Sequence, residues 1–117
     1  FFNHREITMA VKFKKSDVFK TEVTFAEPND AGGFDENTFV AHFKRASHNQ
    51  VKDLRTKEDV EVVRQQLVGW DMVDEDTKQA VPYSEDAREG LLQMSSAPYH
   101  VALAFFRASS GNKAKNS

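Results

Sequence analysis

Four histidines are the only imidazoles in the sequence, and their spacing indicates what chemistry they could perform together. They are His4, His42, His48 and His100. No two stand three to five residues apart and no His-Glu-x-x-His motif occurs, so nothing predicts a zinc site. The absence of cysteine also excludes thiol nucleophiles and Cys-based metal sites. His42 alternates with Ala41 and Phe43 in a strand-like pattern, and we expect it to face solvent. We expect no metal and no cofactor.

The serines and glycines form no motif of a nucleophile or of a phosphate-binding loop. Ser110-Gly111 lacks the preceding glycine of the Gly-x-Ser-x-Gly elbow. Gly32-Gly33 is the only glycine pair, and it lacks both the dinucleotide-binding pattern and the Gly-Lys-Ser/Thr of a P-loop. The pair is typical of a hairpin loop instead. We therefore expect a protein that is not an enzyme.

Acidic residues are concentrated in residues 71–89. This segment contains seven Asp or Glu and only two basic residues, Lys78 and Arg88, which gives a local charge of about −5. The spacing does not fit a calcium loop, because neither Asp71 nor Asp74 starts a run with Gly at its sixth position and Glu at its twelfth. Two interpretations remain for the acidic stretch. It is either a solvated surface, which is the commoner role, or an electrostatic guide for a basic partner.

Five aromatic residues are candidates for binding a protein partner, because Trp and Tyr are frequent at interface hot spots. They are Trp70, Tyr83, Tyr99, Phe105 and Phe106. Such residues also anchor cores while keeping one polar atom near water, and we favour a core position for Trp70. We expect Tyr99, Phe105 and Phe106 on a surface that a partner covers, since the last helix has more apolar face than a small core can use.

The first half of the chain has the pattern of strands. Residues 18–25 and 38–44 alternate with a period of two, and the segment 28–33 between them concentrates turn-forming residues. The pattern predicts an antiparallel hairpin with a long connection. Val11 and Phe13 are expected to supply a further short strand.

Beyond the hairpin the apolar period becomes helical. Ser47 followed by Gln50 fits a capping box. Thr56 is the expected N-cap of a helix that ends near Val68, with Gly69 at the position where a C′ glycine belongs.

Two more helices are expected in the last third of the chain. The first is capped by Ser84, and its buried side is expected to consist of Ala87, Leu91, Leu92 and Met94. The second begins near Ser96, tolerates Pro98 in its first turn and ends at Gly111. This last helix is apolar nearly all round, which is typical of a helix central to the core or covered by a partner.

Length and composition suit one small domain. The chain has 117 residues, 39% hydrophobic and 29% charged, with a net charge of −2 and ten phenylalanines. We expect a single α+β domain over residues 9–111, with an N-terminal antiparallel β-hairpin or small sheet followed by three or four α-helices. Residues 1–8 are expected to be a tag or non-native leader, because Met9-Ala10 resembles a natural start, and residues 112–117 a disordered polar tail. The lack of a basic excess and of a long apolar run predicts no nucleic-acid and no membrane partner.

One series of motifs resembles a known family. The string Leu67-Val68-Gly69-Trp70, a short acidic turn, Val81-Pro82-Tyr83-Ser84-Glu85 and the pair Leu91-Leu92 are similar in order and spacing to the tail assembly chaperones of long-tailed bacteriophages, of the siphophage type. The family tends to close with an aromatic-rich helix and a short polar tail, here Ala102–Ser109 and Lys113–Asn116. The resemblance covers about residues 38–117.

The resemblance implies a protein without enzymatic activity that works in the host bacterial cytoplasm. Such chaperones bind the tape-measure protein, keep it soluble and help to recruit tail-tube protein, and they are generally absent from the mature virion. Many also exist in a longer form made by ribosomal frameshifting, with which A-rich codons for residues 112–116 would be compatible. A homo-oligomer is a further expectation, because the last helix needs cover.

Two rival functions remain from the sequence. A structural tail-completion or connector protein of the virion is the runner-up, and an enzyme or small-ligand binder is the third. The chaperone is the leading expectation, because a holdase for an apolar helical client needs exposed apolar surface and no catalytic constellation.

Overall fold

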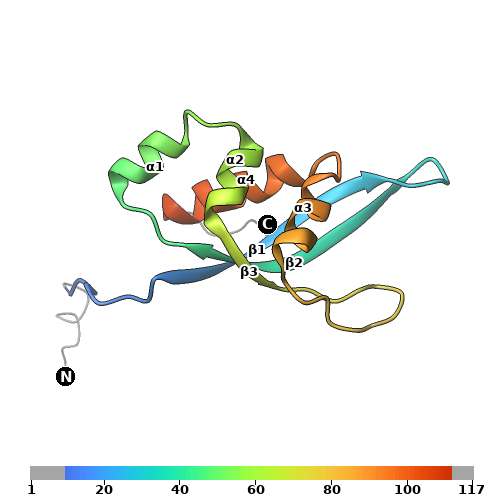
Figure 1. Ribbon diagram of the computed structural model, residues 1–117, viewed down its shortest axis with the longest axis horizontal. Coiled ribbons are helices and arrows are strands. Elements are labelled where there is room, and N and C mark those ends of the chain that lie inside the picture. Colours follow the sequence, from blue (N-terminus) through green and yellow to red (C-terminus); the bar gives the residue numbers. More distant parts are fainter. Residues whose placement is uncertain (1–9, 112–117) are drawn as a thin grey trace, which may run out of the picture.

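The computed structural model describes residues 10–111 of the chain. The expectations for a leader at 1–8 and a polar tail at 112–117 concern residues outside this range. Three strands and four helices form over the described residues (Figure 1). They are, in chain order, β1 (Val18–Pro28), β2 (Phe34–Lys44), α1 (His48–Leu54), α2 (Asp59–Gln66), β3 (Leu67–Asp71), α3 (Glu85–Leu92) and α4 (Ala97–Ser109). The expected α+β fold, with a small antiparallel sheet before most of the helices, is confirmed.

The sheet has the order β1-β2-β3 with both pairs antiparallel. Side chains alternate along β1 and β2, so that one face of the sheet is buried beneath the helices and the other is exposed. The hairpin loop is held by Asn29, whose side-chain oxygen accepts hydrogen bonds from the backbone N–H groups of Ala31 and Gly33, both at 3.0 Å. Gly32 has a φ of +88°, which explains the need for glycine there. The predicted hairpin is therefore confirmed.

The third strand is not the one that the sequence indicated. Residues 10–17 form no strand, and Val11 and Phe13 are 71% and 90% exposed, so the expected short strand at these residues is wrong. The partner of β2 is instead β3, in which Gly69 pairs with His42 and Trp70 with Ala41. Sheet pairing between distant segments overrides the local helical pattern here.

The start and end of α2 also differ from the expectation. Thr56 does not cap α2: its hydroxyl donates to the Asp53 carbonyl at 2.7 Å, and Glu58 occupies the N-cap. At the other end the chain turns extended at Leu67, with φ −81° and ψ 116°. Gly69 is therefore a strand residue and not a C′ glycine. The capping box of α1 at Ser47 and Gln50 is present as expected.

The other two helix starts agree with the sequence. Ser84 accepts a hydrogen bond from the Ala87 N–H at 3.0 Å and caps α3. Ser96 is the N-cap residue of α4, with Pro98 in the first turn, and Gly111 follows the helix with a φ of +85°. Within the expected buried side of α3, Leu91 and Leu92 are buried, whereas Met94 lies beyond the helix end and is 39% exposed.

The core lies between the buried face of the sheet and the helices. Phe43 and Phe105, both fully buried, meet with ring centroids 5.4 Å apart, and α4 packs on both β1 and α2. The remaining buried apolar residues continue this cluster along the sheet toward Phe25 and Phe39. The core thereby fixes the positions of β2, β3 and α3 around the site described next.

Candidate functional site

The Gly-Trp and Pro-Tyr-Ser motifs fold into one unit. Trp70 on β3 donates from Nε1 to the Val81 carbonyl at 2.8 Å, and the Tyr83 hydroxyl donates to the Leu67 carbonyl at 2.9 Å. The rings of Trp70 and Tyr83 meet nearly perpendicular, with centroids 5.0 Å apart. Trp70 is 7% exposed, so the favoured core position is confirmed. These polar ends of two aromatic side chains tie the segment before α3 to β3.

The acidic turn between the two motifs has a defined geometry. Asp74 accepts hydrogen bonds from the backbone N–H groups of Thr77 and Asp76, which hold the pKa of its carboxyl below the usual range. Asp74 therefore stays ionised to a lower pH than a free aspartate does. Lys78 adopts a φ of +61°, and the turn is closed by a bridge between Val73 and Ala80. Over residues 10–111, no three acidic or imidazole side chains gather in a way that could hold a metal ion.

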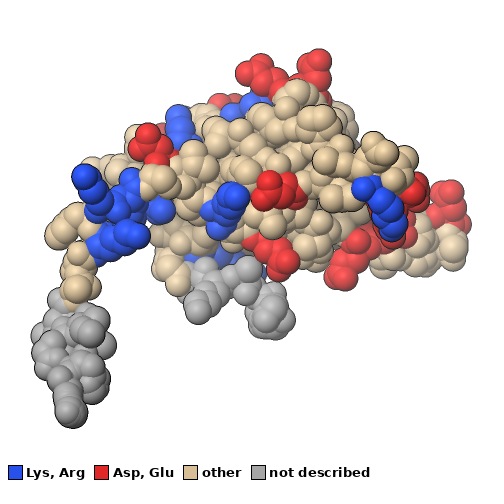
Figure 2. Space-filling view, turned by 90° about the horizontal axis from the view of Figure 1, so that it is seen from below, with Lys and Arg blue, Asp and Glu red and all other residues tan. Residues whose placement is uncertain are grey.

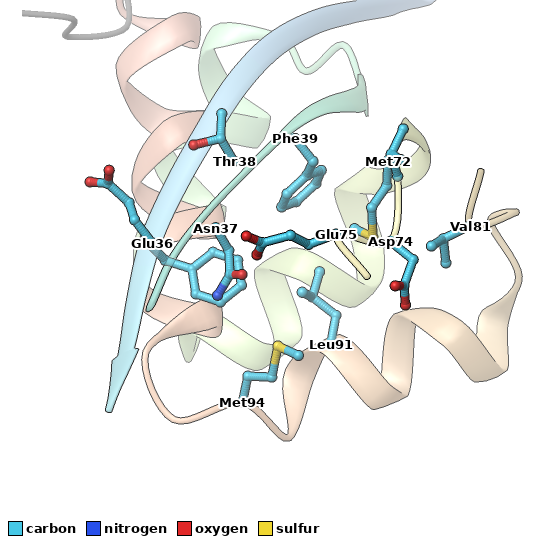
Figure 3. Close-up of a pocket in the computed structure, with 12 residues that line it drawn as sticks. Glu36, Asn37, Thr38, Phe39, Met72, Asp74, Glu75, Val81, Leu91 and Met94 are labelled. Atoms are coloured by element: carbon cyan, nitrogen blue, oxygen red, sulfur yellow. The ribbon is translucent and has the colours of Figure 1, made fainter. Parts of the chain in front are cut away.

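A groove of about 500 Å³ opens beside this turn, between β2, the segment that follows β3, and α3 (Figure 3). Its apolar lining consists of Phe25, Phe39, Met72, Val73, Val81, Leu91 and Met94. Its acidic residues are Glu36, Asp74 and Glu75, and no basic residue lines it. The Glu75 side chain points across the opening (Figure 3).

The floor and the rim of the groove differ in exposure. Phe25, Phe39 and Leu91 are buried at its base, whereas Met94 and Val73 are 39% and 60% exposed at its edge. An apolar floor beneath carboxylates, with no His, Ser or Lys in the lining, is suited to binding an apolar side chain that has cations on either side of it. We call this site the acidic groove.

The five predicted aromatic residues do not form this site. Phe105 is fully buried, and its expected position on a partner-covered surface is wrong: it fills the core between the sheet and α4. Phe106 is half-buried, with the Arg55 guanidinium 4.7 Å from its ring centre. Tyr99 is 55% exposed, as expected, but it does not line the acidic groove. The fold brings Trp70 and Tyr83 together beside the groove, whereas the contact between Phe105 and Phe106 lies on α4 away from it.

Two charged clusters lie outside the groove. The Asp71 carboxylate is 3.2 Å from His42 Nε2 and 3.7 Å from Lys20 Nζ, and these neighbours, His42 foremost, lower the pKa of Asp71. His42 projects from the face of the sheet opposite the helices, as expected, but Lys20, Gly69 and Asp71 around it leave its side chain only 23% exposed. Its neighbour across the strands is Gly69, which leaves room for the imidazole.

The second cluster joins α2 to α3. Arg64 donates to both carboxylate oxygens of Glu89, at 2.7 and 3.0 Å, and Arg88 donates to the same carboxylate at 3.2 Å. The hydrogen bonds from Arg64 are the main cause of a lowered pKa of Glu89. This cluster supports the position of α3, and through α3 that of Leu91 in the groove.

Comparison with models of known families, with characterised proteins and with solved structures finds no match to this chain. None of the helices formed by residues 10–111 has the length and apolar character needed to cross a membrane. The acidic groove therefore has to be interpreted from its own geometry.

Proposed function

We propose that this protein is a tail assembly chaperone of a long-tailed bacteriophage, which holds a tape-measure protein by non-covalent contacts in the host cytoplasm. The observation that carries the proposal is the acidic groove, an open apolar site with three carboxylates and no basic residue in its lining. A long helical client exposes apolar side chains interspersed with Lys and Arg. The groove accepts such a segment, and its charge raises the rate of encounter.

The arrangement of the resemblance motifs supports the same proposal. Trp70 and Tyr83 contact each other, Trp70 contacts Phe39 and Val81 of the groove lining, and Leu91 of the Leu91-Leu92 pair belongs to that lining. A family whose members bind a client at this surface would need all of these motifs, because each contributes to the same site. In the proposed function these residues build the site, and the residues that touch the client are the exposed ones at its edge.

The client experiment is co-expression of the full chain with the tape-measure protein of a siphophage-type tail, measuring the soluble fraction of the client and the recovery of a complex. Met94→Asp and Glu75→Lys are expected to weaken the complex by roughly tenfold, equivalent to about 1.4 kcal/mol. The matched control is Glu22→Lys, which reverses an exposed carboxylate on β1 outside the groove. A client that is equally soluble with every variant would contradict the proposal.

The virion supplies a second test. A chaperone that also recruits tail-tube protein is expected to be absent from purified particles, as mass spectrometry of their proteins can determine. Recovery in stoichiometric amounts would instead favour the tail-completion or connector protein.

A further inference from the structure

An exposed basic arm precedes the sheet. Residues 10–17 form neither strand nor helix, and within them Phe13 is 90% exposed and Val11 is 71% exposed. The neighbours of Phe13 are cationic: Lys12, Lys14 and Lys15. Two exposed apolar side chains interleaved with cations can dock into a site that is apolar and acidic.

The base of this arm is fixed to the end of the sheet. The Arg45 backbone N–H donates to the Asp17 carbonyl at 2.8 Å, and Arg45 Nε donates to the Ser16 carbonyl at 2.7 Å. Only the residues before Ser16 are therefore free to reorient, and the arm leaves the molecule at the end of the sheet away from the hairpin loop (Figure 1).

The arm is too short to reach the acidic groove of its own molecule. The groove begins near Phe39, which pairs with Val23 on β1, seven residues beyond Ser16. Seven residues of antiparallel strand span about 24 Å. Phe13 stands three residues before Ser16 and can move at most about 11 Å from it. An occupant of the groove that has the chemistry of this arm must come from another molecule.

The arm and the groove are complementary in apolar character and in charge. The arm has two exposed apolar side chains and three cations, and the groove has an apolar floor and three carboxylates. Lys and Arg gather at the end of the molecule that carries the arm, while Asp and Glu are more numerous toward the other end (Figure 2). Such a polar layout favours a head-to-tail contact between copies over a symmetric one.

We propose that Phe13 of one copy inserts into the acidic groove of a second copy, with Lys12, Lys14 and Lys15 facing the groove's carboxylates. The contact joins two different surfaces, so it forms either a closed ring or an open chain. This contact between copies uses the same groove as the proposed function, but it does not depend on the identity of the client. In that function the arm covers the apolar floor until a client displaces it.

The first experiment measures the mass of the full chain by light scattering over a range of protein and salt concentrations. We expect a mass above that of the monomer that rises with protein concentration and falls in about 1 M salt, where the screening length is about 3 Å. Phe13→Ser is expected to shift the association midpoint at least tenfold, whereas Tyr99→Ser, at an exposed aromatic residue outside both surfaces, leaves it unchanged. A monomer under all conditions would overturn the proposal.

A mixing experiment identifies the two surfaces. The Phe13→Ser variant keeps its groove, and the variant with Glu36→Lys and Glu75→Lys keeps its arm. Each is expected to be monomeric alone, with an unchanged circular dichroism spectrum. Their mixture retains one functional arm and one functional groove, so it is expected to form a 1:1 dimer and nothing larger. If the mixture stays monomeric while the unmodified chain associates, another surface is responsible and the proposal is wrong.

The same variants separate this proposal from the chaperone function. A client held by the unmodified groove but lost with Glu36→Lys and Glu75→Lys supports the client site, whatever the mass measurement shows. Phe13→Ser is expected to bind that client more tightly than the unmodified chain does, because no arm competes for the groove. Equal client affinity in these two chains would contradict occupation of the groove by the arm.

Discussion

Gly69 and His42 face each other across β2 and β3 with little room for an additional side-chain atom. A Cβ at Gly69 would lie 3.0 Å from His42 Nδ1, closer than ordinary van der Waals contact. The glycine therefore serves the close approach of an imidazole from the neighbouring strand. The same residue opens the Gly-Trp motif, so one physical reason for that motif is the packing of His42.

We expect Gly69→Ala to lower the free energy of unfolding by about 1–3 kcal/mol, because the imidazole must shift and the sheet must adjust. Urea unfolding followed by circular dichroism measures this. In a His42→Ala background, Gly69→Ala is expected to lower the free energy of unfolding much less, because the imidazole that its Cβ would meet is absent. An equal cost in both backgrounds would mean that backbone conformation, and not His42, requires the glycine.

Glu89 makes the stability of the α2–α3 contact depend on pH. Its pKa is lowered in the folded state, chiefly by the hydrogen bonds from Arg64. The ionised carboxylate therefore stabilises the fold above the unfolded-state pKa, and this contribution is lost as the pH falls through the folded-state pKa. We expect Glu89→Gln to have a lower urea midpoint than the unmodified chain at pH 7, with the gap closing in acid below about pH 4.

The control for Glu89 is Glu22→Gln, an exposed carboxylate on β1. It is expected to leave the midpoint nearly unchanged at both pH values. A gap for Glu89→Gln that persists in acid would show that the ion pair with Arg64 is not its cause.

At the scale of elements, α4 is a core helix with one exposed flank. Phe105 contacts Phe43, Phe19 and Phe106 through its ring, whereas Tyr99 on the first turns is exposed. We expect Phe105→Ala to lower the free energy of unfolding by about 3–5 kcal/mol and Phe105→Asp to prevent folding. Tyr99→Ala is expected to stay within about 0.5 kcal/mol of the unmodified chain. A folded Phe105→Asp variant, seen by circular dichroism, would contradict the burial of this ring.

The elements that local patterns determine could be predicted from the sequence. The β1–β2 hairpin follows from strict alternation and a glycine loop, and the α1 and α3 starts follow from Ser47 and Ser84 as side-chain caps. β3 could not be predicted, because Val60, Val63 and Leu67 continue a helical spacing. Only the pairing with β2, more than twenty residues away, turns Leu67–Asp71 into a strand.

The acidic groove illustrates the same limit for a site. Its carboxylates Asp74 and Glu75 belong to an acidic run that is evident in the sequence, and one interpretation of that run was a basic partner. Its floor combines Phe39 from β2 with Leu91 from α3, residues that no local pattern relates. Four of the five candidate aromatic residues pack in or against the core, because large rings stabilise a small core most, and only Tyr99 remains exposed.

At the scale of the whole molecule, the hairpin extends farther than the core beneath it (Figure 1). Phe25 and its cross-strand region are the last buried positions, and beyond them Phe34 is 72% exposed. We expect amide hydrogens of residues 34–36 to exchange at least about tenfold faster than those of residues 39–43, because the outer ladder opens without unfolding the core. Hydrogen exchange followed by mass spectrometry tests this, and uniform protection along β2 would contradict it.

Trp70 is the single tryptophan of the chain, and its indole lies beside the acidic groove. Its ring meets that of Phe39 at 6.0 Å between centroids, and its Nε1 donates to the carbonyl of Val81, so both neighbours also line the groove. The emission of an indole responds to the polarity and packing around it. The chain therefore contains an optical reporter next to its own candidate site, and a tryptophan-free occupant that disturbs Phe39 or Val81 is expected to change its emission without a label.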